Sequence, residues 1–362
     1  MRTGLSFVLA LMLLFALAAC ASTPTETSAP PAETGVQETE AAATPGTLAY
    51  EGYKVGYCPP TLTDSWLATI AEKVGYYCEA QGIEFLATEG QGDITVQIQQ
   101  IENFISMGCD IVIAQPVNLD AYESVVKEAR DHGVKVVFWA DDPTYDVEAC
   151  YLSVAEVQGS MCGEMAISWG DQVFGKDAEA GSIKVAWLTT QYDDRPDAKN
   201  RQDAMIEAIA DDPRFEVVFR KDNLTNPNDC TDAMNECLAL NPDINVVFTF
   251  SDAHAIGANA AVMADKSLDY TKIAIFAATA TDEGREMVDQ SATDNGSVIR
   301  GLVTFGEGDS YFKGGAEAIM GVIDGTVPLN SVFFCDHEAY NSFGYVSSFD
   351  AEEYAKSYVA NN

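Results

Sequence analysis

Short apolar segments alternate with amphipathic segments along most of this chain, and that alternation limits the folds it can adopt. Runs such as 111–114 (Ile-Val-Ile-Ala) are continuously apolar, which is typical of strands buried on both faces of a sheet. Between them lie stretches such as 94–107, where isoleucines recur at helical spacing on one face. Strands and helices that alternate in this way form parallel sheets covered by helices. Two such series follow one another, so the sequence predicts an α/β fold with two doubly wound parallel-sheet lobes.

The same patterns predict the individual elements. We expect strands at 54–57, 83–87, 110–114, 134–139, 183–188, 215–220, 246–250, 273–277 and 298–304. We expect helices at 65–81, 94–107, 119–132, 157–173, 198–210, 230–240, 253–264, 283–290 and 311–323.

We expect the following division of the chain between the lobes. The first lobe would comprise 50–153 plus 307–335, and the second 154–304 plus 338–350. The chain would then cross between the lobes three times, near Ser153, near 304–306 and near 335–337, and these crossovers would form a hinge.

The first residues of the chain predict export from the cytoplasm. Arg2 precedes an almost entirely apolar run over 5–19, which is short for a membrane span and ends in small residues. We interpret 1–19 as a signal peptide. The run ends Leu-Ala-Ala-Cys, which resembles the lipobox of bacterial lipoproteins and would make Cys20 the lipidated first residue of the mature protein. The alternative is an ordinary secretory cleavage beside an unrelated cysteine.

Residues 20–49 are predicted to tether the folded body to the membrane. The segment is rich in Ala, Thr, Pro and Glu, and it lacks enough apolar residues to form a core. We interpret it as a disordered linker behind the lipid anchor, which would place the protein outside the cytoplasm on the bacterial cell membrane. The alternative is a proline-rich recognition segment.

Charge and missing motifs exclude several classes of function. The chain of 362 residues has 56 acidic and 20 basic residues, for a net charge of -36. Nucleic acids and anionic membrane surfaces require a positive binding face, so neither is an expected partner. The sequence has no Walker loop, no Gly-x-Ser-x-Gly elbow and no His-Glu-x-x-His motif, and we predict that the protein is not an enzyme. Paired metal-ligand motifs are also missing, and we expect no metal or cofactor.

The chain has nine cysteines, and eight remain when Cys20 is set aside. An even number in an exported protein is compatible with disulfides. Most of the eight lie in apolar or helical surroundings, where a cysteine also serves as a small buried hydrophobe. The sequence leaves both interpretations open.

Four segments resemble the type 1 periplasmic binding proteins of the ribose- and galactose-binding kind, which serve ABC importers. They are 54–67, with its aromatic-bearing loop; 108–116 (Gly-Cys-Asp-Ile-Val-Ile-Ala-Gln-Pro); 133–141, which ends in an aspartate; and 243–258, which contains Ser-Asp-Ala-His-Ala-Ile-Gly-Ala. The resemblance covers nearly the whole body, from about 54 to 345. It implies a monomer that closes by hinge motion on a small polar solute and then docks on a membrane permease.

The resemblance also implies the solute-binding residues. Asp64, Trp66 and Leu67 match contacts of the first loop, and Asp141, followed by Asp142, matches the charged residue after the fourth strand. In the second lobe the matching or adjacent residues are Arg201, Ser251, Asp252 and Thr279. Ala278 stands where sugar-binding members usually have an aspartate.

Each of these residues also has a purely structural interpretation. Trp66 could stack on a sugar ring or pack against its own helix, and Trp139 could be a second platform or part of the core. Asp64 could bind hydroxyls or cap a helix. Arg201 could grip vicinal hydroxyls or form a surface ion pair. We expect His254 to be structural.

The sequence therefore predicts an extracytoplasmic lipoprotein that delivers a sugar or sugar derivative to an ABC importer. Two alternatives remain: a nucleoside as the solute, because lipoproteins for purine nucleosides share this fold, and presentation of the solute to a membrane sensor protein.

Overall fold

The computed structural model describes residues 48–116, 118–139, 142–190, 192, 196–293 and 296–361. The signal peptide, Cys20, nearly all of the linker and Asp141 lie outside these residues. Residues 47–362 form one compact unit. None of the described helices is both long enough and apolar enough to span a membrane.

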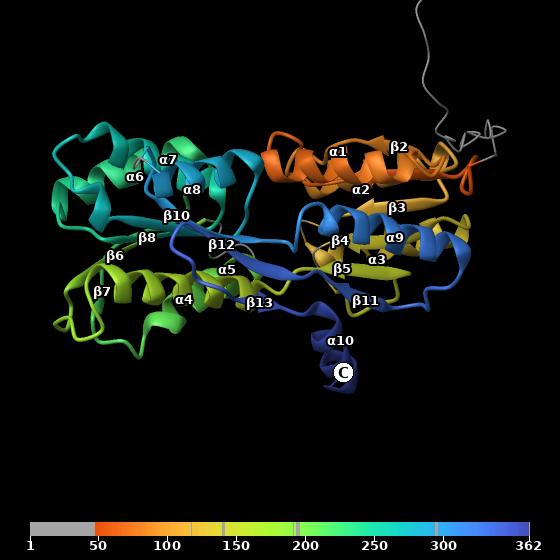
Figure 1. The fold of residues 1–362 in the computed structure, drawn as a ribbon. Helices are drawn as coiled ribbons and strands as arrows, with labels where there is room; N and C mark the ends of the chain where they lie inside the picture. The colour runs from red at the N-terminus through yellow and green to blue at the C-terminus, as the bar shows by residue number, and fades with distance from the viewer. Residues whose placement is uncertain are drawn as a thin grey trace, which may run out of the picture. The chain divides into compact units, whose positions relative to one another are not determined.

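The first lobe is built on a six-stranded parallel sheet in the order β11-β5-β4-β3-β1-β2. Helices cover both faces of this sheet (Figure 1). Helices α1 and α9 pack on one face, and α2 and α3 pack on the other. The element bounds are β1 Lys54–Cys58, α1 Ser65–Glu79, β2 Glu84–Ala87, α2 Ile94–Ser106, β3 Ile111–Ala114, α3 Glu123–Asp131, β4 Lys135–Trp139, β5 Ala149–Leu152, α9 Ser310–Asp324 and β11 Ser331–Phe334.

The second lobe has a seven-stranded sheet in the order β13-β12-β10-β9-β8-β6-β7. Strands β6 to β10 are parallel, whereas β12 and β13 join the edge as antiparallel strands. Helices α4 and α5 cover one face, and α6, α7 and α8 cover the other. The bounds are α4 Ala155–Val173, β6 Ile183–Leu188, α5 Pro196–Ile209, β7 Phe215–Lys221, α6 Pro227–Leu240, β8 Val246–Thr249, α7 Asp252–Ala264, β9 Ala274–Ala277, α8 Asp282–Thr293, β10 Ile299–Thr304, β12 His337–Asn341 and β13 Ser348–Phe349.

The two lobes of the predicted α/β fold are confirmed, but the sequence pattern missed β5, β11, β12 and β13. Among the described residues no helix separates β4 from β5 or β11 from β12, so a search for alternating strands and helices does not find them. The predicted helix at 119–132 is divided into a short 3-10 turn, Leu119–Tyr122, and α3.

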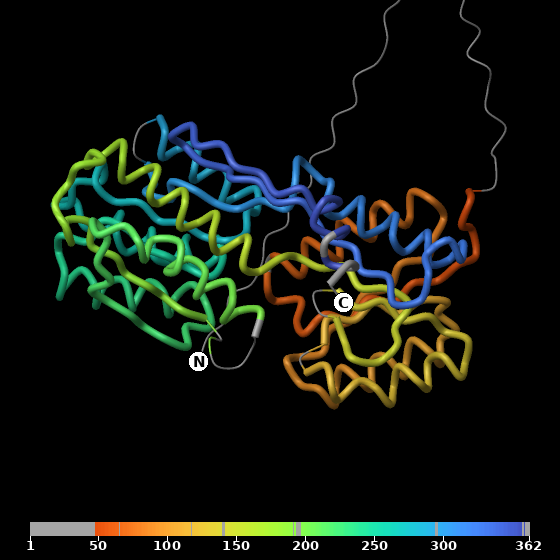
Figure 2. Tube along the Cα trace, turned by 90° about the horizontal axis from the view of Figure 1, so that it is seen from below, coloured from red at the N-terminus to blue at the C-terminus, as the bar shows by residue number. Residues whose placement is uncertain are grey.

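The chain passes between the two sheets after β5, after β10 and between β11 and β12. Figure 2 shows these passages as yellow-green and blue segments. A further helix that the sequence did not predict, α10 (Ala351–Asn361), leaves the second sheet and packs on β11. There the Phe334 ring lies 4.9 Å from Tyr354 and 5.2 Å from Tyr358, between ring centroids. The last described helix therefore returns to the first lobe.

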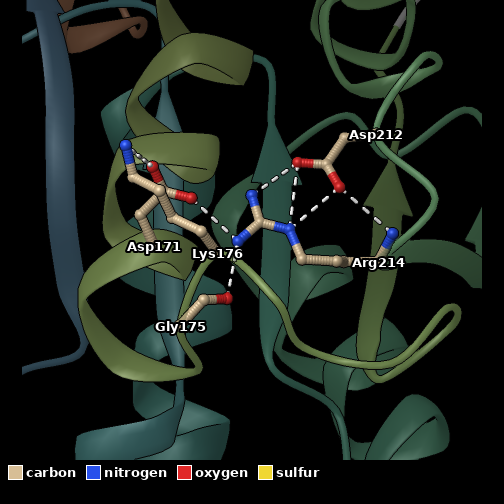
Figure 3. Close-up of polar contacts among 5 residues, drawn as sticks. All are labelled: Asp171, Gly175, Lys176, Asp212 and Arg214. Atoms are coloured by element: carbon tan, nitrogen blue, oxygen red, sulfur yellow. Dashed lines mark hydrogen bonds and ion pairs between the residues drawn. The ribbon is translucent and has the colours of Figure 1, made fainter.

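A buried arginine joins two elements of the second lobe (Figure 3). The side chain of Arg214 donates to both carboxylate oxygens of Asp212, with Nε 2.9 Å from one of them. Its Nη1 lies 2.8 Å from the carboxylate of Asp171, in the last turn of α4, and 2.8 Å from the carbonyl oxygen of Gly175, just after that helix. These hydrogen bonds raise the pKa of Arg214 and lower the pKa of Asp212. The cluster anchors the turn before β7 to α4.

The eight described cysteines are all buried thiols, and they form no disulfide with one another. Burial raises the pKa of Cys58, Cys78, Cys230 and Cys237 to about 12. Because the thiolate is the reactive form, these cysteines act as hydrophobic core residues.

This arrangement predicts that reductant leaves the stability of the protein unchanged. The melting temperature should be the same with and without dithiothreitol, because no disulfide among the eight restricts the unfolded chain. Ellman's reagent should react with the eight thiols in denaturant but not in the native protein. A clear drop in melting temperature with dithiothreitol would contradict the thiol assignment.

Candidate functional site

A cavity of about 870 Å³ is lined by residues of both lobes. Most of its lining follows the carboxyl ends of strands, where parallel sheets place their binding loops. The first lobe and the passage after β10 contribute Pro60, Thr61, Thr63, Asp64, Trp66, Leu67, Thr69, Lys73, Phe305, Gly308, Asp309, Tyr311 and Phe312. The second lobe contributes Thr190, Thr225, Asn226, Pro227, Phe250, Ala253, His254, Ile256, Ala280, Thr281, Asp282, Glu283 and Arg285.

An aromatic wall forms the first-lobe side of the cavity. Trp66 stacks on Phe305 with ring centroids 4.5 Å apart and an interplanar angle of 20°. The rings of Tyr311 and Phe312 also pack near Trp66, with their centroids 5.4 and 5.6 Å from the Trp66 ring centroid. Trp66 and the neighbouring Leu67 are half-buried and belong to both the core cluster and the cavity lining. The ring therefore packs on the core and also lines the cavity, while its contact with a sugar stays a prediction.

Asp64 likewise has two roles. Its carboxylate accepts a hydrogen bond from the Leu67 amide at 3.0 Å and so caps α1. The residue also lines the cavity. An N-cap carboxylate has further lone pairs, so the cap leaves acceptor capacity for a solute.

Lys73 lines the cavity too, and the sequence did not single it out. Its Nζ lies 2.6 Å from Asp309 and 5.1 Å from the centroid of the Phe312 ring. Lys73 lies on the same face of α1 as Trp66, seven residues or about two turns further on, and this spacing was a signal available in the sequence.

The second-lobe wall contains Phe250, with Arg201 behind it. Arg201 is 6% exposed and does not line the cavity; its guanidinium carbon lies 4.5 Å from the Phe250 ring centroid. Its Nη1 donates to the Ala278 carbonyl at 3.4 Å. Helix α5 packs so close to α4 that a Cβ on Gly159 would lie 2.0 Å from the Arg201 carbonyl oxygen. Arg201 therefore supports this wall in place of the predicted direct contact.

Asp252 and Thr279 also lie beneath the cavity surface. The Asp252 carboxylate is buried and accepts hydrogen bonds from the Thr279 hydroxyl and from the Thr281 amide, each at 2.6 Å. The Thr279 hydroxyl in turn accepts from the Asp252 amide at 3.0 Å. These bonds occupy the groups that were expected to meet a solute, and they hold the segment 280–283 that lines the cavity.

Three further candidates lie away from this lining. The exposed Asp142 carboxylate accepts a hydrogen bond from the Tyr358 hydroxyl at 2.6 Å. Trp139 is buried, and its indole donates to the Tyr311 hydroxyl, so its core interpretation holds. The side chain of Ser251 interacts with His254 Nδ1 at 2.6 Å and does not line the cavity. Asp141 lies outside the described residues.

His254 and Thr190 are buried residues that line the cavity, 7% and 4% exposed. His254 Nε2 and Thr190 Oγ1 have no hydrogen-bond partner among the described residues. Burial lowers the pKa of His254, against the opposing charges of Asp64, Asp252 and Asp229, and the imidazole is therefore neutral at pH 7. Because an unsatisfied buried polar group costs about 1–3 kcal/mol, a solute that supplies partners gains affinity here.

Within the described residues no cluster of three metal-ligating side chains occurs.

Comparison with known proteins agrees with this geometry. A family model described as a periplasmic binding protein domain matches residues 55–300. The chain belongs to this family. Its members are solute-binding proteins that act outside the cytoplasm, and the predicted resemblance is confirmed.

Individual relatives of this periplasmic binding protein are distant. The ribose import binding protein of Bacillus subtilis is 22% identical over 262 residues, which cover 72% of this chain and 77% of that protein. An ABC transporter solute-binding protein of Actinobacillus succinogenes with bound D-allose is 16% identical, with a TM-score of 0.67 over 84% of this chain and 100% of that one. A solute-binding protein of Bacillus halodurans with bound myo-inositol is 19% identical, with a TM-score of 0.64 over 86% and 99%.

Asp252→Ala should destabilise the protein by about 3 kcal/mol, because it removes a buried charged acceptor and leaves its donors unsatisfied. Urea unfolding monitored by circular dichroism measures this loss. Asp282→Ala is the matched control: this exposed residue lines the same cavity, and its loss should cost less than about 1 kcal/mol. Equal losses in the two variants would contradict a structural role for Asp252.

His254→Gln should flatten the acid side of the stability profile. The pKa of His254 is lower in the folded than in the unfolded protein, so its contribution is complete above about pH 6.5 and is lost as pH falls. Below that pH the wild-type protein should lose up to about 1.4 kcal/mol more per pH unit than the variant. The measurement is urea unfolding between pH 4.5 and 7.5, with the exposed His132→Gln as control. Parallel profiles for wild type and His254→Gln would refute the shift.

Proposed function

We propose that this protein is an extracytoplasmic lipoprotein that binds a sugar or sugar derivative and delivers it to an ABC importer. The observation that carries the proposal is the composition of the cavity. An aromatic wall from the first lobe meets a second-lobe wall that holds buried polar atoms without hydrogen-bond partners among the described residues. A sugar ring has an apolar C–H face and a hydroxyl edge, which suit these two walls.

In this proposal the solute stacks on the cavity side of Trp66. Its hydroxyls meet Asp64 of the first lobe and Thr190, Asn226 and His254 of the second. Contacts from both lobes favour the closed arrangement over the open one, and the hinge supplies the motion. Arg201, Asp252 and Thr279 act by holding the second-lobe wall.

The relatives and the sequence support the remaining parts of the proposal. Proteins named for binding ribose, D-xylose and galactofuranose are among the relatives, so a sugar is the leading class of solute. The lipobox-like Leu-Ala-Ala-Cys20 and the linker over 20–49 favour a lipid-anchored monomer beside a membrane permease. We assign no catalytic step.

A thermal-shift screen of D-ribose, D-allose, myo-inositol, nucleosides and amino acids tests the solute class. A sugar or sugar derivative should raise the melting temperature, because it binds only the folded state. Trp66→Ala should weaken that binding about tenfold, the loss expected for about 1.4 kcal/mol of ring contact. Titration calorimetry measures the affinity.

Tyr76→Ala is the matched control, because Tyr76 lies on the same helix as Trp66 and is 66% exposed. It should leave the affinity unchanged. A shift with amino acids alone, or equal effects of the two substitutions, would overturn the proposed solute or its site.

A further inference from the structure

One buried histidine lies where the passages between the lobes meet. His337 is the first residue of β12, directly after the passage from β11, and it is fully buried. A polar ring in such a position requires a structural reason, because burying a polar group without partners is unfavourable.

The imidazole contacts the other passages as well. Its Nε2 accepts a hydrogen bond at 3.2 Å from the amide of Val154, between β5 and α4. Its ring meets Phe305, directly after β10, edge to face with centroids 5.4 Å apart. On another side it stacks on Phe349 of β13 at 5.5 Å and 29°. A single side chain thus contacts the first and second passages and lies at the end of the third.

The chemistry of the ring suits this position. Nε2 can accept a hydrogen bond only when it carries no proton, which places the proton of the neutral ring on Nδ1. Burial, helped by the positive charge of Arg201, lowers the pKa of His337 to about 3. The buried Nδ1 has no hydrogen-bond partner among the described residues. The ring is therefore neutral at physiological pH, and the buried Val154 amide keeps its acceptor.

The same contacts connect the hinge to the cavity. Phe305 stacks on Trp66 at 4.5 Å on one side and meets His337 on another. One ring, that of Phe305, therefore lies between Trp66 and His337. A solute that moves Trp66 would act on Phe305, and through it on the passages.

We propose that His337 is the positioning residue of the hinge. It holds the passages in one arrangement and, through Phe305, links that arrangement to the wall of the cavity. The link to closure on a solute rests on the proposed function, whereas the restraint on the hinge itself does not.

The first test needs no solute. Hydrogen–deuterium exchange of the full chain is compared for His337→Phe, which keeps an aromatic ring but loses the acceptor, and His337→Gln, which keeps an acceptor. In His337→Phe the Val154 amide should exchange about tenfold faster, while strands β3 and β8 in the cores of the lobes keep their protection. In His337→Gln the Val154 amide should stay largely protected. His132→Phe is the control, because His132 is exposed in the first lobe.

The second test measures the lobes directly. Spin labels carried by unnatural amino acids replace the exposed Asn103 on α2 and Asn235 on α6. Without solute, the distribution of distances between them should be broader in His337→Phe than in wild type. Phe305→Leu, which keeps the acceptor but removes the ring between Trp66 and His337, should broaden it with the Val154 amide still protected.

Several outcomes would overturn the proposal. One is unchanged exchange at Val154 together with an unchanged distance distribution. Another is a uniform loss of protection through both lobes in His337→Phe and in Phe305→Leu, which indicates a general structural role only. Because both tests are made without solute, a failure here leaves the result of the solute screen intact, and a negative screen leaves the hinge assignment intact.

Discussion

The parallel pairing of strands within each sheet is the constraint on which the candidate site depends. In the first sheet β1 pairs with β2 and β3, and in the second β8 pairs with β6 and β9, all in parallel. Parallel strands end at one edge, and the loops that follow them collect there. Residues distant in sequence, such as Trp66, Phe250 and Thr281, therefore line one cavity.

Two buried charged side chains of the second lobe support the wall of this cavity. Asp252 is buried and fully engaged by threonines, and Arg201 lies behind Phe250 with a hydrogen bond to the Ala278 carbonyl. A buried charge is tolerated only when it is paired or hydrogen-bonded. These partners direct both side chains toward the protein, whereas Phe250, Thr190 and His254 are among the residues that line the cavity.

Much of the fold and part of the site could be predicted from the sequence. The strands were found because they are continuously apolar runs, and the helices because their apolar side chains repeat at a period of about 3.6. Strands β5, β11 and β12 were missed because no helix among the described residues separates β4 from β5 or β11 from β12, and β13 was missed because it is only two residues long. Asp64, Trp66 and Leu67 line the cavity, and their contact with a solute stays a prediction. Asp142, Arg201, Ser251, Asp252 and Thr279 follow or lie near strand ends too, but their side chains have other partners. Position after a strand selects a loop, whereas the direction of each side chain depends on its neighbours in space.

The sequence by itself determined the α/β class, the two lobes and the loops from which a site can be built, because these follow from local periodicity and chain order. Tertiary structure decided which residues of those loops line the cavity, and it placed His337 against Val154, Phe305 and Phe349. The physical reason is that burial and hydrogen bonding act between residues far apart in the chain. A histidine in β12 acquires a role in the hinge only when three separate segments are packed around it.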